Sequence, residues 1–156
     1  MKEIQLTQGK VAIIDDEDLE KVYQYKWCAC KGGKTFYAQR NIKINGKYTM
    51  VSMHRFIMDY PIGLQVDHIN HNGLDNRKEN LRVCNAAQNQ WNQKSRTDNA
   101  SGFRGVSLFG KKWRAHIRIS SKKIYLGSFN AKEEAAFAYD KKAVELFGEF
   151  ACLNFP

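Results

Sequence analysis

A polar segment in the second half of the chain constrains the fold most strongly. Residues 92–102 are almost free of large apolar side chains, and such a composition is typical of a linker. The chain has 156 residues, which is enough for one medium-sized domain or for two small ones. We therefore predict two modules, residues 1–92 and residues 102–156, joined by a linker over residues 93–101.

The region before residue 66 has short runs of β-branched and aromatic residues separated by turn-forming residues, a pattern that predicts strands. Asn45-Gly46 stands between two alternating apolar stretches. This dipeptide favours a tight hairpin because both residues tolerate positive φ. The acidic run at residues 15–20 favours a helix N-terminus. We expect mostly antiparallel strands, interrupted by a short helix over residues 15–24.

The region after residue 102 has a more regular pattern. From Lys112 to Ile119 apolar and polar residues alternate strictly, which predicts a strand with one core face and one basic face. Residues 122–126 continue the pattern as a returning strand. The expected outward residues are Arg114, His116, Arg118, Lys123 and Tyr125, and the expected inward residues are Trp113, Ala115, Ile117, Ile119, Ile124 and Leu126.

A helix follows the two strands. Asn130 and Glu133 have the spacing of a capping box, and Gly148 stands where a C-terminal cap is expected. The alanines between them would allow the helix to lie close to a sheet. We therefore predict an α+β protein: a β-rich N-terminal region and, at the C-terminus, a three-stranded antiparallel sheet packed on one helix.

Basic residues outnumber acidic ones. The chain has 25 Lys and Arg against 16 Asp and Glu, which gives a formal net charge of +9 and favours a nucleic-acid partner. Residues 21–55 and 104–123 contain lysine and arginine but no acid. Two such surfaces could follow a phosphate backbone, although each could instead be a solvated lysine-rich face.

The cysteines at positions 28, 30, 84 and 152 lack the spacing of a zinc site or a disulfide framework. We expect reduced thiols and no zinc. The sequence shows no signal peptide and no apolar run long enough to cross a bilayer. These observations predict a cytoplasmic protein with no membrane and no small-molecule cofactor among its partners.

One group of polar residues could support phosphodiester hydrolysis, which needs a base and a hard cation. Asp67 and His68 fall on an expected strand, Asn80 follows a polar loop, and Asn89 falls in the first turns of a helix beginning near residue 85. The oxygens of Asp67 and Asn89 are ligands that magnesium or manganese prefers. His68 is the natural base, and Asn80 could orient its imidazole. Adjacent strand residues point to opposite faces, however, so an ideal strand would not bring Asp67 and His68 into one site.

Three segments, Val66–Asn70, Asn76–Arg82 and Gln88-Asn89, resemble the HNH (ββα-metal) motif of phage and intron-encoded homing endonucleases, in the variety whose third residue is Asn. The resemblance implies double-stranded DNA as substrate and one Mg²⁺ or Mn²⁺ ion held by Asp67 and Asn89. It implies His68 as the general base and Asn80 as the residue that orients it. It also places the Asp-His pair at the end of a hairpin strand packed on the helix, and it implies that the cytoplasm is that of a bacterial or phage-infected host cell.

Residues 102–156 are similar to the plant Apetala/ethylene-response-factor DNA-binding domain. The matching motifs are Phe103–Val106, Trp113–Arg118, Tyr125–Phe129, Ala135–Asp140 and Leu153–Pro156. The likeness implies a sheet that enters the major groove. The candidate DNA-binding residues are Arg104, Arg114, His116, Arg118, Lys123 and Tyr125. His116 and Tyr125 replace the Glu and Trp of the plant domains, so the plant target sequence does not carry over.

Several alternatives stay open. His54 and Arg55 could extend the catalytic face, but a lone histidine in a strand is more often structural. The whole protein could be a non-catalytic DNA-binding transcriptional regulator that keeps the nuclease motif as scaffold, or a zinc-dependent binding module built on the cysteines. Competent residues at all four catalytic positions favour a nuclease. We predict a metal-dependent HNH endonuclease and expect a monomer. A single site in a monomer would cut one strand, whereas two cuts would need a dimer or a second visit.

Overall fold

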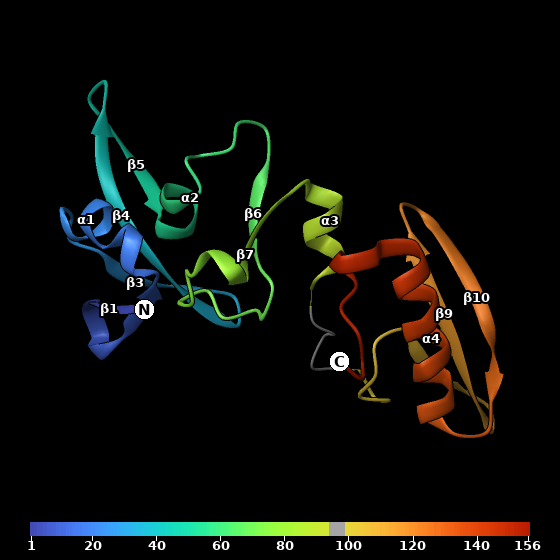
Figure 1. Cartoon of the computed structure of the whole chain (residues 1–156). Helices are drawn as coiled ribbons and strands as arrows, with labels where there is room; N and C mark the ends of the chain where they lie inside the picture. Colours follow the sequence, from blue (N-terminus) through green and yellow to red (C-terminus); the bar gives the residue numbers. More distant parts are fainter. Residues whose placement is uncertain (94–98) are drawn as a thin grey trace. The chain divides into compact units, whose positions relative to one another are not determined.

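The computed structural model describes residues 1–93 and 99–156 (Figure 1). The chain divides into two compact units, unit 1 from Met1 to Ala86 and unit 2 from Ala87 to Pro156. This boundary lies at the start of a helix that the sequence analysis placed with the nuclease region. Much of the expected linker, residues 94–98, lies outside the described residues. Both units combine helices with antiparallel sheets, so the α+β class is confirmed.

Unit 1 consists of small antiparallel sheets. The first pairs β1 (Lys2–Gln5) with β2 (Val11–Ile14), the second has the order β3 (Cys28–Gly32), β4 (Thr35–Ile44) and β5 (Lys47–Ser52), and the third pairs β6 (Gln65–His68) with β7 (Leu81–Cys84). Two short helices, α1 (Leu19–Tyr23) and α2 (Met53–Ile57), pack with the strands. Ile14, Val22 and Met53 are fully buried in their shared core.

Local sequence explains much of this unit. Asn45 and Gly46 adopt φ of 49° and 81° between β4 and β5, so the predicted hairpin is confirmed. The acidic run forms a 3-10 turn over Asp16–Asp18 that leads into α1, as expected for residues 15–24. The strand expected around His54 is wrong, since this residue lies on α2. One helical turn buries Met53 and Ile57 together in the core, and this burial favours the helix.

Unit 2 begins with α3 (Ala86–Trp91) and continues into a three-stranded sheet covered by a helix (Figure 1). The strand order is β10 (Lys122–Phe129), β9 (Lys112–Ile119) and β8 (Val106–Phe109), and α4 (Lys132–Phe147) packs on one face. Ala115 and Ile117 of β9 are buried beneath α4. The predicted alternation and the predicted sheet and helix are therefore confirmed.

The ends of α4 differ slightly from expectation. The residue preceding the helix is Ala131, whose backbone N–H donates to a carboxylate oxygen of Glu134 at 3.3 Å. The capping box expected from Asn130 and Glu133 is therefore wrong by one residue. Gly148 follows the last helical residue with φ of 53°, which confirms its place as the cap.

The cysteines and the apolar helices were also subjects of the sequence analysis. None of the four cysteines forms a disulfide. Within residues 1–93 and 99–156, no helix is both long enough and apolar enough to span a bilayer.

Candidate functional site

Asp67 and His68 occupy the last two positions of β6. In the antiparallel pair with β7, Asp67 lies opposite Arg82 and His68 lies opposite Leu81. The Asp67 carboxylate binds the Arg82 guanidinium, with Oδ2 at 2.9 Å from Nη2 and 3.1 Å from Nε. Both side chains are about nine-tenths buried. The hairpin therefore holds a carboxylate in a buried ion pair next to the histidine.

His68 ends the strand with its ring packed among polar and aromatic neighbours. Its Nε2 lies 3.3 Å from the side-chain oxygen of Asn76, and its ring centroid lies 5.7 Å from that of Tyr37. Burial is the main cause that lowers the pKa of His68, while Asn76 and Asp67 act in the opposite direction. The imidazole is therefore neutral near pH 7 and able to accept a proton.

Asn76 was not among the candidates from the sequence, although it lies in a segment of the HNH-like motif. It is fully buried. Its backbone N–H donates to the carbonyl of Ile13 at 2.7 Å, and its side-chain amide donates to the carbonyl of Leu74 at 3.2 Å. These bonds fix the side-chain oxygen that faces His68. The available signal in the sequence was an asparagine between two charged neighbours, Asp75 and Arg77.

Asn80 closes the same loop from its other end. Its side-chain oxygen accepts the backbone N–H of Asn70 at 2.9 Å, and its amide donates to the carbonyl of Asp75 at 2.7 Å. The Asp75 carboxylate binds Arg77 through two oxygens at 2.8 Å and also accepts the Asn70 amide. The Arg77 guanidinium is the main cause that lowers the pKa of Asp75. Asn80 therefore ties together the loop that carries Asn76.

His54, which the sequence analysis considered as an extension of the catalytic face, is a second neighbour of His68. The two rings meet edge to face with centroids 4.8 Å apart. Burial, followed by the charge of His68, lowers the pKa of His54 to about 3. The Nδ1 atom of His54 is buried and has no hydrogen-bond partner among the described residues. The histidine therefore contributes a neutral ring against His68.

Asn89, the expected second metal ligand, lies on α3 and belongs to unit 2. Asp67 therefore belongs to unit 1 and Asn89 to unit 2. A carboxylate and an amide oxygen are hard donors that suit magnesium or manganese. No group of three or more His, Cys, Asp or Glu residues with a metal-binding arrangement occurs in the part of the chain that is described.

The C-terminal end of α3 contacts the rest of unit 2 through hydrogen bonds and a stacked ring pair. The Arg104 guanidinium donates to the carbonyl oxygens of Trp91 at 2.8 Å, of Gln93, and of Gln90 at 3.5 Å. The Trp91 ring stacks on Phe147 with centroids 4.6 Å apart. Arg104 is one of the expected DNA-binding residues, and the structure shows its cation on the carbonyl groups at the C-terminal end of a helix, where positive charge is favourable.

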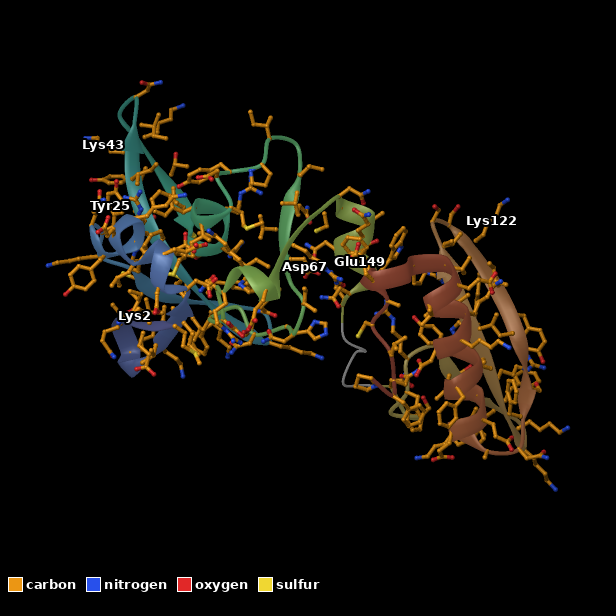
Figure 2. All side chains as sticks on the ribbon, viewed as in Figure 1. Lys2, Tyr25, Lys43, Asp67, Lys122 and Glu149 are labelled. Atoms are coloured by element: carbon orange, nitrogen blue, oxygen red, sulfur yellow. The ribbon has the colours of Figure 1, made fainter. Side chains whose placement is uncertain are left out.

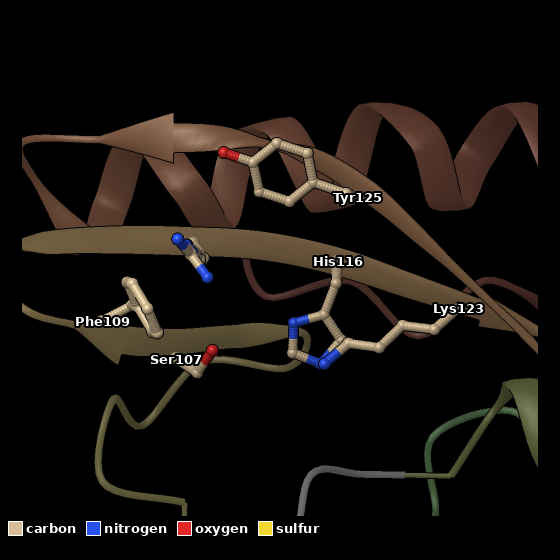
Figure 3. A pocket seen from close by; sticks show the side chains of 6 residues that line it. Ser107, Phe109, His116, Lys123 and Tyr125 are labelled. Atoms are coloured by element: carbon tan, nitrogen blue, oxygen red, sulfur yellow. The ribbon is translucent and has the colours of Figure 1, made fainter.

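The outer face of the unit 2 sheet carries a hollow of about 280 Å³ (Figure 3). It lies on the face of the sheet away from α4 and is lined by Ser107, Phe109, Arg114, His116, Lys123 and Tyr125. Four of the six expected DNA-binding residues therefore gather around one concave surface. The Arg114 guanidinium lies 3.3 Å from the centroid of the Phe109 ring, an arrangement that holds the cation at the sheet surface.

Positive charge accumulates on this face without compensation. Arg118 and Lys123 are directly opposite each other on β9 and β10, and such like-charged pairs destabilise a sheet. Neither residue forms an ion pair with any described residue. Burial and then the charges of Lys123 and Arg118 lower the pKa of His116. A polyanion on this face would relieve the repulsion.

The comparisons with known proteins agree with these features. Residues 59–91, which include Asp67, His68, Asn80 and Asn89, match the profile of the family described as HNH endonuclease. An uncharacterised HNH endonuclease of Acanthamoeba polyphaga mimivirus is 31% identical over 153 residues, which cover 94% of this chain and 76% of the viral protein. Protein 3.8 of Escherichia phage T7 is 33% identical over 93 residues, covering 58% of this chain and 76% of that protein.

Plant proteins match a shorter segment of this chain. An AP2-like ethylene-responsive transcription factor of Arabidopsis thaliana is 40% identical over 58 residues, which cover 36% of this chain and 12% of the plant protein. A dehydration-responsive element-binding protein of Oryza sativa subsp. japonica is 51% identical over 61 residues, covering 36% and 19%. The buried Asp-His hairpin, the profile match and the viral relative together show that this chain belongs to the HNH endonuclease family and carries an AP2-like segment.

Proposed function

We propose that the protein is a metal-dependent DNA endonuclease in which the β6–β7 hairpin cuts and the sheet of unit 2 holds the duplex. The observation that carries this proposal is a neutral, oriented His68 directly beside Asp67 in a chain of the HNH endonuclease family. The viral and phage relatives favour action inside an infected cell, as for a homing-type nuclease.

Asp67 and Asn89 would hold one magnesium or manganese ion. The ion would supply positive charge at the scissile phosphate and the leaving oxygen. The HNH resemblance implies this pair of ligands, and a carboxylate with an amide oxygen suits a hard cation. The Arg82 guanidinium pairs with the Asp67 carboxylate, and this pairing offsets the cost of burying the carboxylate.

His68 would act as the general base. Its neutral imidazole accepts a proton from the attacking water, whose oxygen then forms the new bond to phosphorus. Asn76 holds the ring through Nε2, and Asn80 acts on the histidine through the loop it closes. The HNH resemblance implies that the bond to the 3′ oxygen breaks and that this oxygen takes a proton from solvent, so the expected ends are a 5′-phosphate and a 3′-hydroxyl.

The outer face of the β8–β9–β10 sheet would bind the major groove. Its residues combine cations for phosphates with side chains that hydrogen-bond or stack on base edges. We assign contact to Arg114, His116, Arg118, Lys123 and Tyr125. Arg104 keeps α3 in place from within unit 2 and has no assigned contact with DNA.

Cleavage of supercoiled plasmid by the wild-type chain and by His68→Ala, each with Mg²⁺ and with EDTA, tests this function. We expect the protein to be a monomer. We expect nicked plasmid only from the wild-type chain with Mg²⁺, and we expect His68→Ala to bind DNA as the wild type does. Cleavage by His68→Ala at the wild-type rate would remove the histidine from the mechanism. Tight binding without cleavage by the wild type would favour a DNA-binding regulator.

A further inference from the structure

The far half of β4 and β5 forms a two-stranded ribbon, here called the ribbon tip, that runs from Asn41 to Met50. β3 pairs with β4 only between Thr35 and Gln39, so no strand of unit 1 accompanies the ribbon tip on either side. The turn at residues 45–46 closes it. Figure 1 shows this end of the ribbon extending beyond the other elements of unit 1, and Figure 2 labels Lys43 near it.

From Lys43 to Met50 both faces of the ribbon tip are open to solvent, whereas Ile42 is partly buried against the core of unit 1. Every residue from Lys43 to Met50 is exposed. Tyr48 is 77% exposed and Met50 60% exposed on one face, and Ile44 is 48% exposed on the other. An antiparallel ribbon normally covers one face with core. Apolar side chains on both faces of a projecting ribbon therefore indicate a surface that a partner covers.

The charge of the ribbon tip is positive. Lys43 and Lys47 lie on it, and no acidic residue occurs between residues 21 and 55. Neither lysine forms an ion pair with another described residue. The Lys43 ammonium lies 5.9 Å from the centroid of the Tyr48 ring, so a cation and an aromatic ring stand together. This combination suits a polyanion that also offers flat apolar surfaces.

The dimensions of the ribbon tip suit duplex DNA. At roughly 3.4 Å per residue, the run from Asn41 to Ile44 extends about 10 Å. The major groove is about 12 Å wide and 8.5 Å deep and admits a two-stranded ribbon. A second copy of this chain is a poor partner, because it would bring an equally positive ribbon.

We propose that the ribbon tip is a second DNA contact, separate from the sheet of unit 2, and that it enters the major groove. Lys43 and Lys47 would lie on phosphates, and Tyr48 and Met50 would lie against sugars and base edges. This inference rests on the proposed function, since the ligand is the duplex that the nuclease cuts. It adds a site in unit 1 that fixes the duplex near the catalytic hairpin.

Binding of the full-length chain to a fluorescent mixed-sequence duplex in EDTA, at a series of salt concentrations, tests the ribbon tip. The test variant is Lys43→Gln/Lys47→Gln. Its matched control is Lys26→Gln/Lys31→Gln, which removes the same charge from exposed positions of the same acid-free stretch. Each lost phosphate contact lowers the slope of log Kd against log salt by about 0.9. We expect a loss of about two in slope for the test variant and little change for the control.

A photoreactive benzophenone side chain placed at Tyr48 gives a second readout that does not depend on charge. We expect it to crosslink the full-length chain to the duplex. An unchanged slope together with no crosslink to DNA would overturn the ribbon contact, and so would equal losses in test and control variants or a crosslink to a second copy. If the ribbon fails while the wild type still nicks plasmid with Mg²⁺, the proposed function stands; if the wild type neither binds nor nicks DNA, both proposals fall.

Discussion

The sheet of unit 2 and the hairpin of unit 1 present their functional groups in two different ways. On β9 and β10 the backbone period alone places alternate residues on one outer face. In unit 1, His68 depends on side chains from a loop after β6 and from α2. A binding face can therefore be built from regular structure, whereas the catalytic histidine needs a network of individual hydrogen bonds.

The difference extends to charge. The sheet face leaves Arg118 and Lys123 opposite each other, which favours a partner with negative charge. The hairpin instead pairs Asp67 with Arg82 in a buried ion pair. The cations proposed to bind DNA lie at the surface without an acidic partner among the described residues, whereas the Asp67 carboxylate of the proposed catalytic site is paired with a cation. Variants of the two regions should therefore fail in different ways.

Asp67→Ala should give the largest effect. It removes the carboxylate proposed for the metal and should slow cleavage by about 10³-fold or more, since such an ion supplies several kcal/mol of transition-state stabilisation. It also breaks the buried ion pair with the Arg82 guanidinium, at a cost of about 3 to 5 kcal/mol in the free energy of unfolding. Single-turnover cleavage and urea unfolding measure the two effects.

The double variant Asp67→Ala/Arg82→Met separates these effects. It should recover most of the stability, because replacing both members of a buried pair with apolar groups is often neutral, but it should not recover cleavage. Recovery of cleavage would show that Asp67 acts only through the fold.

Asn76→Ala should rank second. It removes the side-chain oxygen that faces His68 Nε2 and the hydrogen bond from the side-chain amide to the Leu74 carbonyl. The free energy of unfolding should therefore fall by about 1 to 3 kcal/mol. The cleavage rate at saturating DNA should fall while the Kd for DNA stays unchanged. A variant that loses stability but keeps the wild-type rate would refute the orienting role of Asn76.

The two regions were also predictable to different degrees. The strict alternation from Lys112 to Ile119 fixes both faces of β9, since strand period depends only on neighbours in sequence. Asp67 and His68 on a strand before a polar loop were likewise foreseen. Asn76 was not foreseen as a partner of His68, and His54 was considered only as one of two alternatives, because both reach His68 through tertiary packing that has no sequence period. His54 was placed on a strand, yet burial of Met53 and Ile57 makes that segment helical.

Arg118→Gln/Lys123→Gln should affect binding alone. Loss of two phosphate contacts should lower the salt slope of log Kd by about two, and removal of the like-charged pair should not destabilise the sheet. Lys132→Gln/Lys141→Gln on α4, which covers the other face of the sheet, is the control of equal charge. An equal loss in both variants would mean that net charge, not the outer face, determines binding.

Acid should give the smallest effect, on stability. Folding lowers the pKa of His54 from 6.5 to about 3, so between these values the unfolded chain binds a proton that the folded chain does not. The free energy of unfolding therefore falls as pH drops below about 6.5, by up to about 1.4 kcal/mol per pH unit from this residue. Urea unfolding from pH 7 to 5 should show a shallower fall for His54→Gln, and parallel curves would contradict the buried neutral ring.

The most direct test of the division between cutting and holding measures two quantities for two variants. The single-turnover cleavage rate at saturating DNA with Mg²⁺ and the Kd for the same duplex in EDTA would be compared for His68→Ala and Arg118→Gln/Lys123→Gln. We predict that His68→Ala loses about 10²- to 10⁴-fold in rate with an unchanged Kd, and that the sheet variant raises Kd with an unchanged rate. Loss of rate in the sheet variant at saturation, or loss of binding in His68→Ala, would contradict the separation of the two tasks.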